Sequence, residues 1–206
     1  EAAGFWIPHL TGWVGLVDRG HLAAGEWLAV LGAGGGSGIA AVQLGSLLGA
    51  RVIAIVGDDE RAAFCRSLGA QETLNHRDGP LAPALGDLTA GHGVDVIYDP
   101  VGGSSAEDAA GALARYGRWL TVGFASGAWP RPEAHQLVWA NASLVGVLAA
   151  GYSRAELDDI HAHLSDLVRT GRLQNTVTRQ VLFDDLPDAL QRMADRRIVG
   201  KMVMVP

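Results

Sequence analysis

Apolar runs of strand length alternate along this chain with longer segments whose apolar residues recur at helical spacing. The first pattern predicts strands at Trp27–Leu31, Val52–Val56, Glu72–Leu74, Val94–Asp99, Trp119–Val122, Leu144–Leu148 and Lys201–Val205. The second predicts helices at Ile39–Leu48, Glu60–Leu68, Leu81–Leu88, Ala106–Ala114, Arg154–Thr170 and Leu186–Ala194. Such alternation favours right-handed βαβ crossovers on a mostly parallel sheet.

The central strand candidates are the continuous apolar runs LAVL, VIAIV and VDVIY. Continuous runs are typical of strands that helices cover on both faces. We therefore expect an α/β fold, a Rossmann-type doubly wound parallel sheet, over residues 1–206. Residues 1–20 predict an apolar lead-in helix rather than a strand, which hints that the chain is a piece of a larger enzyme.

Composition narrows the class of protein. The chain has 206 residues, of which 49% are hydrophobic and 18% are charged, so it has the length and apolar content of one folded domain. Its formal net charge of −6 gives no basic footprint for nucleic acid or an anionic membrane surface. No apolar run approaches the roughly 18 to 20 residues that cross a bilayer. We expect a soluble protein whose partner is a small molecule.

Cysteine and lysine are each present once. The single cysteine, Cys65, cannot form an internal disulfide or a cysteine-based zinc cluster, which favours the reducing cytoplasm. Of the 16 basic residues, Lys201 is the one lysine. Any chemistry that needs a lysine therefore has one candidate, close to the end of the sequence.

A glycine loop, GAGGGSG over residues 32–38, joins the first predicted strand to an apolar helix. The spacing Ala33-x-Gly35-x-x-Gly38 is the dinucleotide fingerprint with its first glycine replaced by alanine. The diphosphate of a dinucleotide needs exposed N–H groups at a helix N-terminus, and glycine removes the side chains that would block its approach. The loop therefore predicts a nucleotide site, although a tight turn that only serves packing has the same composition.

Other chemistries also use glycine loops. A Walker loop requires a lysine, and none is near the turn. The spacing Gly32-x-x-x-Gly36-x-Gly38 also fits the short-chain dehydrogenases, which need a Tyr-x-x-x-Lys pair that this sequence lacks. A methyltransferase usually has an acidic residue at the end of the second strand to hold the ribose, and at this point it stays open.

The end of the second strand bears on the choice of dinucleotide. An NAD site places Asp or Glu there, but here the strand ends in the neutral Val56-Gly57. Helix capping accounts for the following acidic pair, Asp58-Asp59. Arg61 and His76-Arg77 are donors that could hold a 2′-phosphate, so the sequence favours NADPH over NADH.

Several segments together resemble a known family. In chain order they are HLTGWVGLV, VLGAGGGSGIAAVQLGSLLGARVIA, RSLGAQETLNHRD, GVDVIYDPVGG, YGRWLTVGFASG and GKMVMVP. This series resembles the zinc-independent quinone oxidoreductases, the zeta-crystallin type, of the medium-chain dehydrogenase/reductase superfamily. The resemblance covers essentially the whole chain and counts against a methyltransferase.

The resemblance implies a set of residues that bind the cofactor. The loop and Thr11 would hold the diphosphate, and Arg61 stands where the family commonly has a lysine near the 2′-phosphate. His76 replaces a tyrosine beside the adenosine, and the nicotinamide would lie where the fourth and fifth strands end. The cofactor-binding residues so implied are Thr11, Gly35, Gly36, Ser37, Gly38, Arg61, His76, Val101, Gly123, Phe124 and Arg196.

The resemblance also implies a further domain. Members of this family carry an additional GroES-like, β-rich catalytic domain, on the order of 100 residues, before the segment that matches Glu1–Gly20. That domain forms one wall of the active-site cleft, and it is missing from this sequence. We expect residues 175–206 to pack towards it, so that the strands around Thr176–Phe183 and Lys201–Val205 lack partners. A homodimer would form if the edge strand Leu144–Leu148 pairs with its copy.

Hydride transfer from NADPH demands little covalent chemistry from a protein, which positions the nicotinamide over the substrate and excludes water. The histidines are scattered and no cluster has metal-ligand spacing, so we expect no metal and assign no catalytic residue. The sequence predicts an NADPH-dependent reductase of quinones or α,β-unsaturated carbonyls. The alternatives are a non-catalytic dinucleotide-binding or redox-sensing module and, within the same chemistry, an enoyl-thioester reductase domain.

Overall fold

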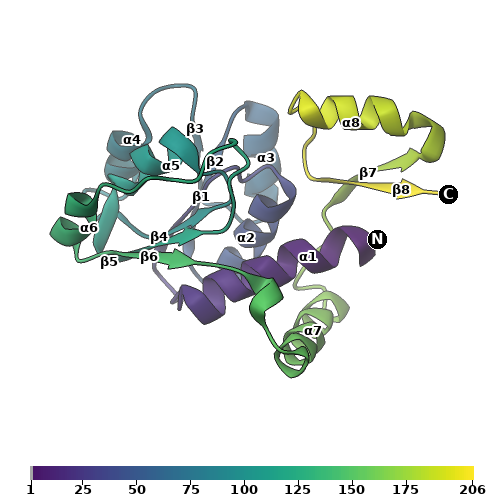
Figure 1. Cartoon of the computed structure of the whole chain (residues 1–206), viewed down its shortest axis with the longest axis horizontal. Helices are drawn as coiled ribbons and strands as arrows, with labels where there is room; N and C mark the ends of the chain where they lie inside the picture. The colour runs from purple at the N-terminus through teal and green to yellow at the C-terminus, as the bar shows by residue number, and fades with distance from the viewer. Residues whose placement is uncertain (1) are drawn as a thin grey trace.

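The computed structural model describes residues 2–206, and in this part of the chain six strands form one parallel sheet (Figure 1). Their order is β3-β2-β1-β4-β5-β6. The strands are β1 (Trp27–Val30), β2 (Arg51–Val56), β3 (Glu72–Asn75), β4 (Val94–Asp99), β5 (Leu113–Thr121) and β6 (Ser143–Gly146). The chain builds one half of the sheet outward from β1 and then crosses to build the other half. This is the doubly wound order that the sequence predicts.

Helices cover both faces of this sheet. The helices are α1 (Ala2–Trp13), α2 (Gly36–Leu47), α3 (Asp59–Ser67), α4 (Leu81–Leu88), α5 (Gly103–Ala110), α6 (Ala134–Ala140), α7 (Arg154–Arg169) and α8 (Leu186–Ala194). Short helical turns follow α1 at Val14–Arg19 and β6 at Ala149–Gly151. One face packs against α1, α2 and α3, with α7 packed on α1 outside this layer, and the other face packs against α4 and α5. The predicted lead-in helix is α1 with the turn that follows it, although its first residue, Glu1, lies outside the described residues.

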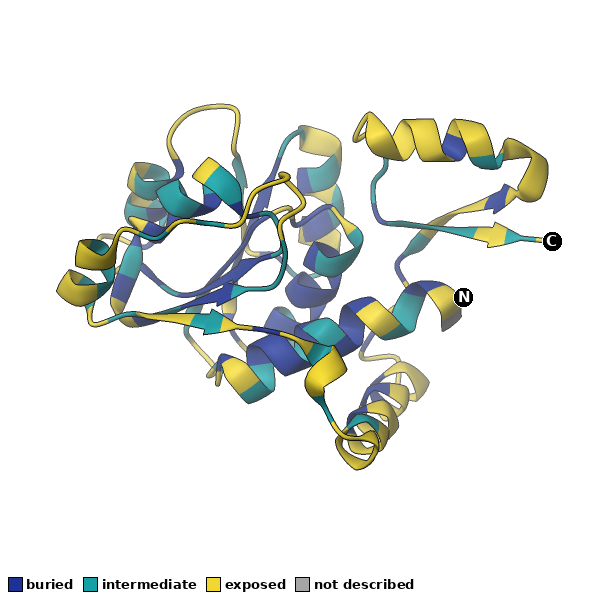
Figure 2. Cartoon of the chain, in the orientation of Figure 1, coloured by how far each residue is buried: buried dark blue, intermediate teal, exposed yellow. Residues whose placement is uncertain are grey.

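The core follows the period of two along each strand. On β2, Val52, Ala54 and Val56 point into one apolar cluster, while Ile53 and Ile55 point into the other. All five are essentially buried, and full burial of a valine or isoleucine side chain contributes about 1.5–3 kcal/mol. Figure 2 shows the buried strands at the centre and exposed residues on α6 and α8. The continuous apolar runs therefore do mark strands covered on both faces.

The C-terminal residues form a second, smaller sheet. Strand β7 (Val177–Leu182) pairs in parallel with β8 (Lys201–Val205), and a helical turn (Phe183–Asp185) and α8 connect the two strands. The expectation that these strands lack partners was therefore wrong, because they pair with each other. Figure 1 shows this unit beside the main sheet, near the N-terminal end of α1. Its packing towards a further domain stays a prediction.

Two other boundaries differ from the prediction. The helix expected at Ala106–Ala114 ends at Ala110, because the chain turns at Gly111 and enters β5 at Leu113. Strand β5 starts early and is irregular, since Tyr116 adopts a left-handed φ of +67°. The short helix α6 was not predicted because it buries none of its residues and so has no apolar stripe.

Candidate functional site

The glycine loop forms a tight turn between β1 and α2. The Ala33 amide donates to the Ile55 carbonyl at 3.0 Å, which ties the turn to β2. A Cβ atom placed on Gly38 would lie 2.6 Å from Ala33 Cα and closer still to the Gly32 carbonyl oxygen. Glycine is thus required at position 38 so that the first turn of α2 can sit directly against the loop. Gly35 is the N-cap and has no side chain to cap the first N–H groups of the helix, which suits them for an anion.

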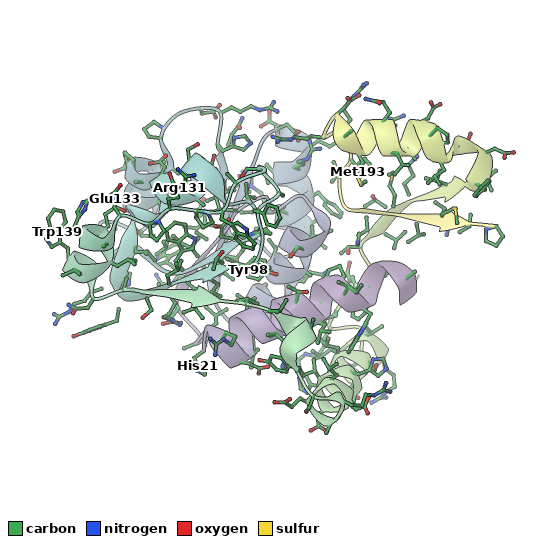
Figure 3. All side chains as sticks on the ribbon, in the orientation of Figure 1. His21, Tyr98, Arg131, Glu133, Trp139 and Met193 are labelled. Atoms are coloured by element: carbon green, nitrogen blue, oxygen red, sulfur yellow. The ribbon has the colours of Figure 1, made fainter. Side chains whose placement is uncertain are left out.

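Tyr98 on β4 fixes the serine of this loop. Its hydroxyl lies 2.9 Å from Ser37 Oγ, in the first turn of α2. Burial raises the pKa of Tyr98 to about 12, although the Ser37 hydrogen bond works in the opposite direction. Figure 3 labels Tyr98 within the body of the sheet domain. Sequence reasoning missed this pairing, and its one signal was a hydroxyl group in the otherwise apolar end of VDVIY.

The loops that follow β4 and β5 are bonded into one unit. The Ala125 amide donates to the Pro100 carbonyl at 3.1 Å, and the Ser126 amide donates to the Val101 carbonyl at 2.9 Å. The side chain of Val101 lies against the glycine turn, since a Cβ placed on Gly32 would be 2.8 Å from Val101 Cγ2. The structure thus brings the predicted nicotinamide side of the site next to the predicted diphosphate side.

Two other predicted residues, Gly123 and Phe124, lie on the same pair of loops. The Gly123 amide donates to the Asp99 carbonyl at 3.2 Å, and a Cβ placed on Gly123 would approach the Pro100 carbonyl to 3.1 Å. Phe124 is half exposed, and its ring centroid lies 4.5 Å from that of Trp129. This pair leaves an aromatic surface at the carboxyl end of β5.

Asp99, the last residue of β4, organises these loops. One carboxylate oxygen accepts the amides of Val101 and Gly102 at 2.9 and 2.7 Å, and the other accepts Trp119 Nε1 at 3.1 Å. The side chain is fully buried. Burial raises the pKa of Asp99 above its ordinary value, and the three donated hydrogen bonds offset only part of this effect.

The predicted 2′-phosphate residues gather where β2 ends. A Cβ placed on Gly57 would lie 3.0 Å from His76 Nε2 and 3.7 Å from Arg77 Cζ. Arg61 pairs with the carboxylate of Asp58, which caps α3 by accepting the Arg61 amide at 2.9 Å. Partial burial works to raise the pKa of Asp58, but the hydrogen bonds and charge of Arg61, with the charge of Arg77, bring it below the ordinary value.

Arg61 also contacts the segment before β8. Its guanidinium donates to the backbone carbonyls of Arg196 and Ile198, the latter at 2.8 Å. The structure therefore joins two predicted cofactor residues, Arg61 and Arg196, through the backbone of the second. The guanidinium of Arg61 is thus already bonded on two sides.

The same segment continues across the glycine loop. The Gly200 amide donates to the Gly34 carbonyl at 3.0 Å. The side chain of Lys201 lies over Gly36, where an added Cβ would be 2.9 Å from Lys201 Cδ. The sequence identified Lys201 as the one lysine but did not connect it with the loop.

Thr11 is the remaining predicted site residue. Its hydroxyl donates to the Ile7 carbonyl one turn back on α1, at 2.9 Å. Helix α1 packs closely on α2, since a Cβ placed on Gly12 would lie 2.8 Å from Leu44 Cδ1. Contact between Thr11 and a diphosphate stays a prediction.

Metal-binding and thiol chemistry have little support in the described residues. Within residues 2–206, His, Cys, Asp and Glu do not gather in groups of three that could hold a metal ion. Burial raises the pKa of Cys65 to about 11, with a small opposing effect from Arg61, so its thiol stays protonated at neutral pH. None of the helices in this part of the chain has both the length and the apolar character of a membrane-spanning helix.

The sheet order and the glycine turn are those of a Rossmann-type α/β domain. Residues 36–166 match the family described as zinc-binding dehydrogenase, and the chain belongs to that family.

Individual relatives match almost the whole chain. Quinone oxidoreductase-like protein 2 of Bos taurus is 30% identical over 208 residues, which cover 99% of this chain and 60% of the bovine protein. A phenolphthiocerol/phthiocerol polyketide synthase of Mycobacterium tuberculosis is 29% identical over 218 residues, which cover 99% of this chain and 10% of that protein. The structure of Escherichia coli quinone oxidoreductase complexed with NADPH has a TM-score of 0.90 at 26% identity, covering 100% of this chain and 64% of that one. The chain thus spans less than two thirds of the length of these relatives.

Proposed function

We propose that this chain is the cofactor-binding part of a zinc-independent oxidoreductase that uses NADPH to reduce quinones or α,β-unsaturated carbonyl compounds. The observation that supports the proposal most directly is the close approach of the Val101 loop to the glycine turn, because it brings the residues predicted to hold the nicotinamide next to those predicted to hold the diphosphate. The names of the bovine and Escherichia coli relatives support the substrate class.

The residues present fit a dinucleotide. Gly38 leaves no room for a side chain where the loop meets α2, and the amides of the first turn of α2 face an end that no side chain caps. Ser37, held by Tyr98, adds a hydroxyl group at the same place. The cofactor supplies the hydride when it is bound. The protein binds the diphosphate on α2, holds the nicotinamide against the Val101 loop and excludes water from the reacting atoms.

Arg61 is the residue with which we test the cofactor preference. Arg61→Ala should weaken NADPH binding by roughly 10-fold to 30-fold, because a charge-assisted hydrogen bond to the 2′-phosphate is lost. NADH binding should change by less than about twofold, because NADH carries a ribose hydroxyl at that place. Fluorescence titration of both cofactors measures the two constants.

The NADH titration separates this role from a structural one. Arg61 also holds the carbonyls of Arg196 and Ile198, and loosening that segment would weaken both cofactors alike. Arg66→Ala is the matched control, because Arg66 lies on the same helix and its guanidinium donates to the Thr73 hydroxyl instead. Equal losses for NADPH and NADH in Arg61→Ala would contradict the 2′-phosphate assignment.

Activity is tested on the full-length gene product that carries this segment. Steady-state oxidation of NADPH is measured with a panel of quinones, α,β-unsaturated ketones and enoyl thioesters. We expect turnover with quinones or unsaturated ketones. NADPH binding with background rates on the whole panel would instead support a non-catalytic dinucleotide-binding module.

The similarity to the polyketide synthase favours one second candidate, an enoyl-thioester reductase domain. Such domains typically place a lysine after the Val-Gly of the fifth strand, where this chain has Phe124. Because Phe124 packs against Trp129 and offers no donor, we rank this candidate second. Turnover confined to enoyl thioesters would reverse the order.

We further propose a homodimer that forms along β6. This strand is the last in the sheet order, and its Ser143, Leu144 and Gly146 are exposed. Sedimentation of the full-length product should show a dimer, and the double change Leu144→Lys with Leu148→Lys should give a monomer, because two buried charges oppose the pairing. Leu190→Lys on α8 is the control, since Leu190 is similarly exposed but lies on the other unit. A dimer that survives the double change would place the interface elsewhere.

The setting that fits this function is the cytoplasm. Cys65 is the one cysteine and is buried, so the fold gains nothing from an oxidising compartment. The net charge of −6 favours a small-molecule substrate over nucleic acid or an anionic membrane.

A further inference from the structure

A pocket of about 490 Å³ opens at the edge of the main sheet where its parallel strands begin. Trp27 and Arg51, the first residues of β1 and β2, line it together with Asp95 near the start of β4 and His92 in the loop before that strand. The glycine turn and the loops after β4 and β5 lie at the carboxyl ends of the same strands. The length of the strands therefore separates this pocket from the candidate cofactor site. Its volume is within the range of about 300–1,000 Å³ that is typical of small-molecule sites.

Arg51 places an unpaired cation in this pocket. Trp27 and Arg51 are register partners on neighbouring strands, and Arg51 Cζ lies over the indole, 5.0 Å from the ring centroid. Among residues 2–206, the Arg51 guanidinium has neither an ion-pair partner nor a hydrogen-bond acceptor. The contact with the indole thus positions the charge and leaves the N–H groups of the guanidinium for an acceptor that the described residues do not supply.

The two carboxylates that line the pocket already have partners. The carboxylate oxygens of Glu26 accept the two terminal nitrogens of the Arg118 guanidinium, at 2.8 and 2.7 Å. One oxygen of Asp95 accepts the Trp27 amide at 2.8 Å, and the other lies 3.0 Å from His92 Nε2. The guanidinium over the indole is therefore the charge in this pocket that is left for a ligand.

We propose that this pocket binds a small aromatic carboxylate. The carboxylate group pairs with the planar fork of Arg51, and the ring packs beside Trp27. One guanidinium matches one carboxylate in charge and in shape. A phosphate dianion fits less well, because its second negative charge would lie near Glu26 and Asp95. The inference goes beyond the proposed function, because this site lies at the opposite edge of the sheet from the cofactor loops.

The test uses benzoate as the probe, in calorimetric titrations of the full-length gene product. Benzoate should bind with saturation. Benzamide, which has no charge, acetate, which has no ring, and inorganic phosphate should each bind at least roughly 10-fold more weakly. Because the two sites lie at opposite edges of the sheet, a saturating concentration of NADPH should change the benzoate constant by less than about twofold.

Substitution of Arg51 tests the assignment of the site. Arg51→Met keeps an unbranched stem beside Trp27 and removes the charge, so it should weaken benzoate by roughly 10-fold to 30-fold. Arg51→Lys keeps the charge without the planar fork and should bind benzoate more tightly than Arg51→Met does. Arg115→Met is the matched control, because Arg115 Cζ lies over the Tyr116 ring at 4.8 Å but outside the pocket. Thermal unfolding of each variant checks that the fold is retained.

Several results would overturn this proposal. One is wild-type affinity for benzoate in Arg51→Met, and another is an equal loss in Arg115→Met, because any surface arginine would then have the same effect. Displacement of benzoate by NADPH would place the acid in the cofactor site instead. Phosphate that binds as tightly as benzoate would contradict the ligand class, and a wild type that shows no saturable binding of benzoate would contradict the site itself.

Discussion

Gly38→Ala is expected to weaken NADPH binding by roughly 100-fold or more, on the order of 3 kcal/mol. The added Cβ would meet Ala33 Cα at 2.6 Å and the Gly32 carbonyl oxygen closer still, and backbone atoms cannot move aside as a flexible side chain can. The first turn of α2 must therefore shift away from the loop, which carries its N–H groups away from the diphosphate. The same crowding should destabilise the fold by about 1–3 kcal/mol.

Gly86→Ala supplies the matched control. Gly86 lies inside α4, and a Cβ placed there meets no atom of the described residues within 4 Å. Alanine has the higher helix propensity, so this variant should gain about 0.5–1 kcal/mol and bind NADPH unchanged. Titration and thermal unfolding of both variants measure the effects. Normal NADPH affinity in Gly38→Ala would refute the diphosphate site at this turn.

Asp99→Ala is expected to give the second large effect, a loss of stability of about 2–4 kcal/mol. The change removes the acceptor for the Val101 and Gly102 amides and for Trp119 Nε1, and it leaves three donors buried or partly buried. For a chain of this length, the melting temperature should fall by roughly 5–15 °C. Asp99→Asn, which retains one oxygen for the two amides, should lose less.

The control is Asp159→Ala on α7, an exposed aspartate that should change stability by less than about 0.5 kcal/mol. A second readout is the dependence of stability on pH. Because the folded-state pKa of Asp99 is raised, the folded protein binds more protons than the unfolded chain between the two pKa values. The contribution of Asp99 to stability is complete at pH values below the ordinary carboxyl pKa, and it is lost as the pH rises through the raised pKa. If the stability of Asp99→Asn changes with pH as that of the wild type does, another group causes the dependence on pH.

The main sheet could be predicted from the sequence because its signals are local. Strands β1, β2 and β4 contain continuous apolar runs next to a helix, and the parallel order follows from the crossover rule. The pairing of β7 with β8 could not be predicted in this way, since their partners are set by contacts across a connecting helix rather than by either strand's pattern. Helix α6 buries none of its residues, so the sequence has no apolar periodicity there that would predict a helix.

The same difference between local signals and long-range contacts decides which parts of the candidate site could be predicted. The glycine loop could be predicted from its fingerprint spacing, and Arg61 and His76 could be predicted because they follow the end of a strand. The bond between Tyr98 and Ser37 joins residues 61 positions apart, and Lys201 reaches Gly36 from the other end of the sequence. Such contacts exist only once the chain has folded, so a spacing rule has nothing to detect.

Tyr98 and Asp99 are adjacent on β4, yet they respond differently to acidity. The phenol of Tyr98, with a pKa of about 12, keeps its proton across the whole physiological pH range, so its bond to Ser37 is indifferent to pH. Asp99, which holds the loop after β4 through the Val101 and Gly102 amides, is a carboxyl group that takes up a proton as the pH falls through its raised pKa. A fall in pH that protonates Asp99 therefore acts on the loops after β4 and β5, while the bond between Tyr98 and Ser37 at the glycine turn does not depend on it.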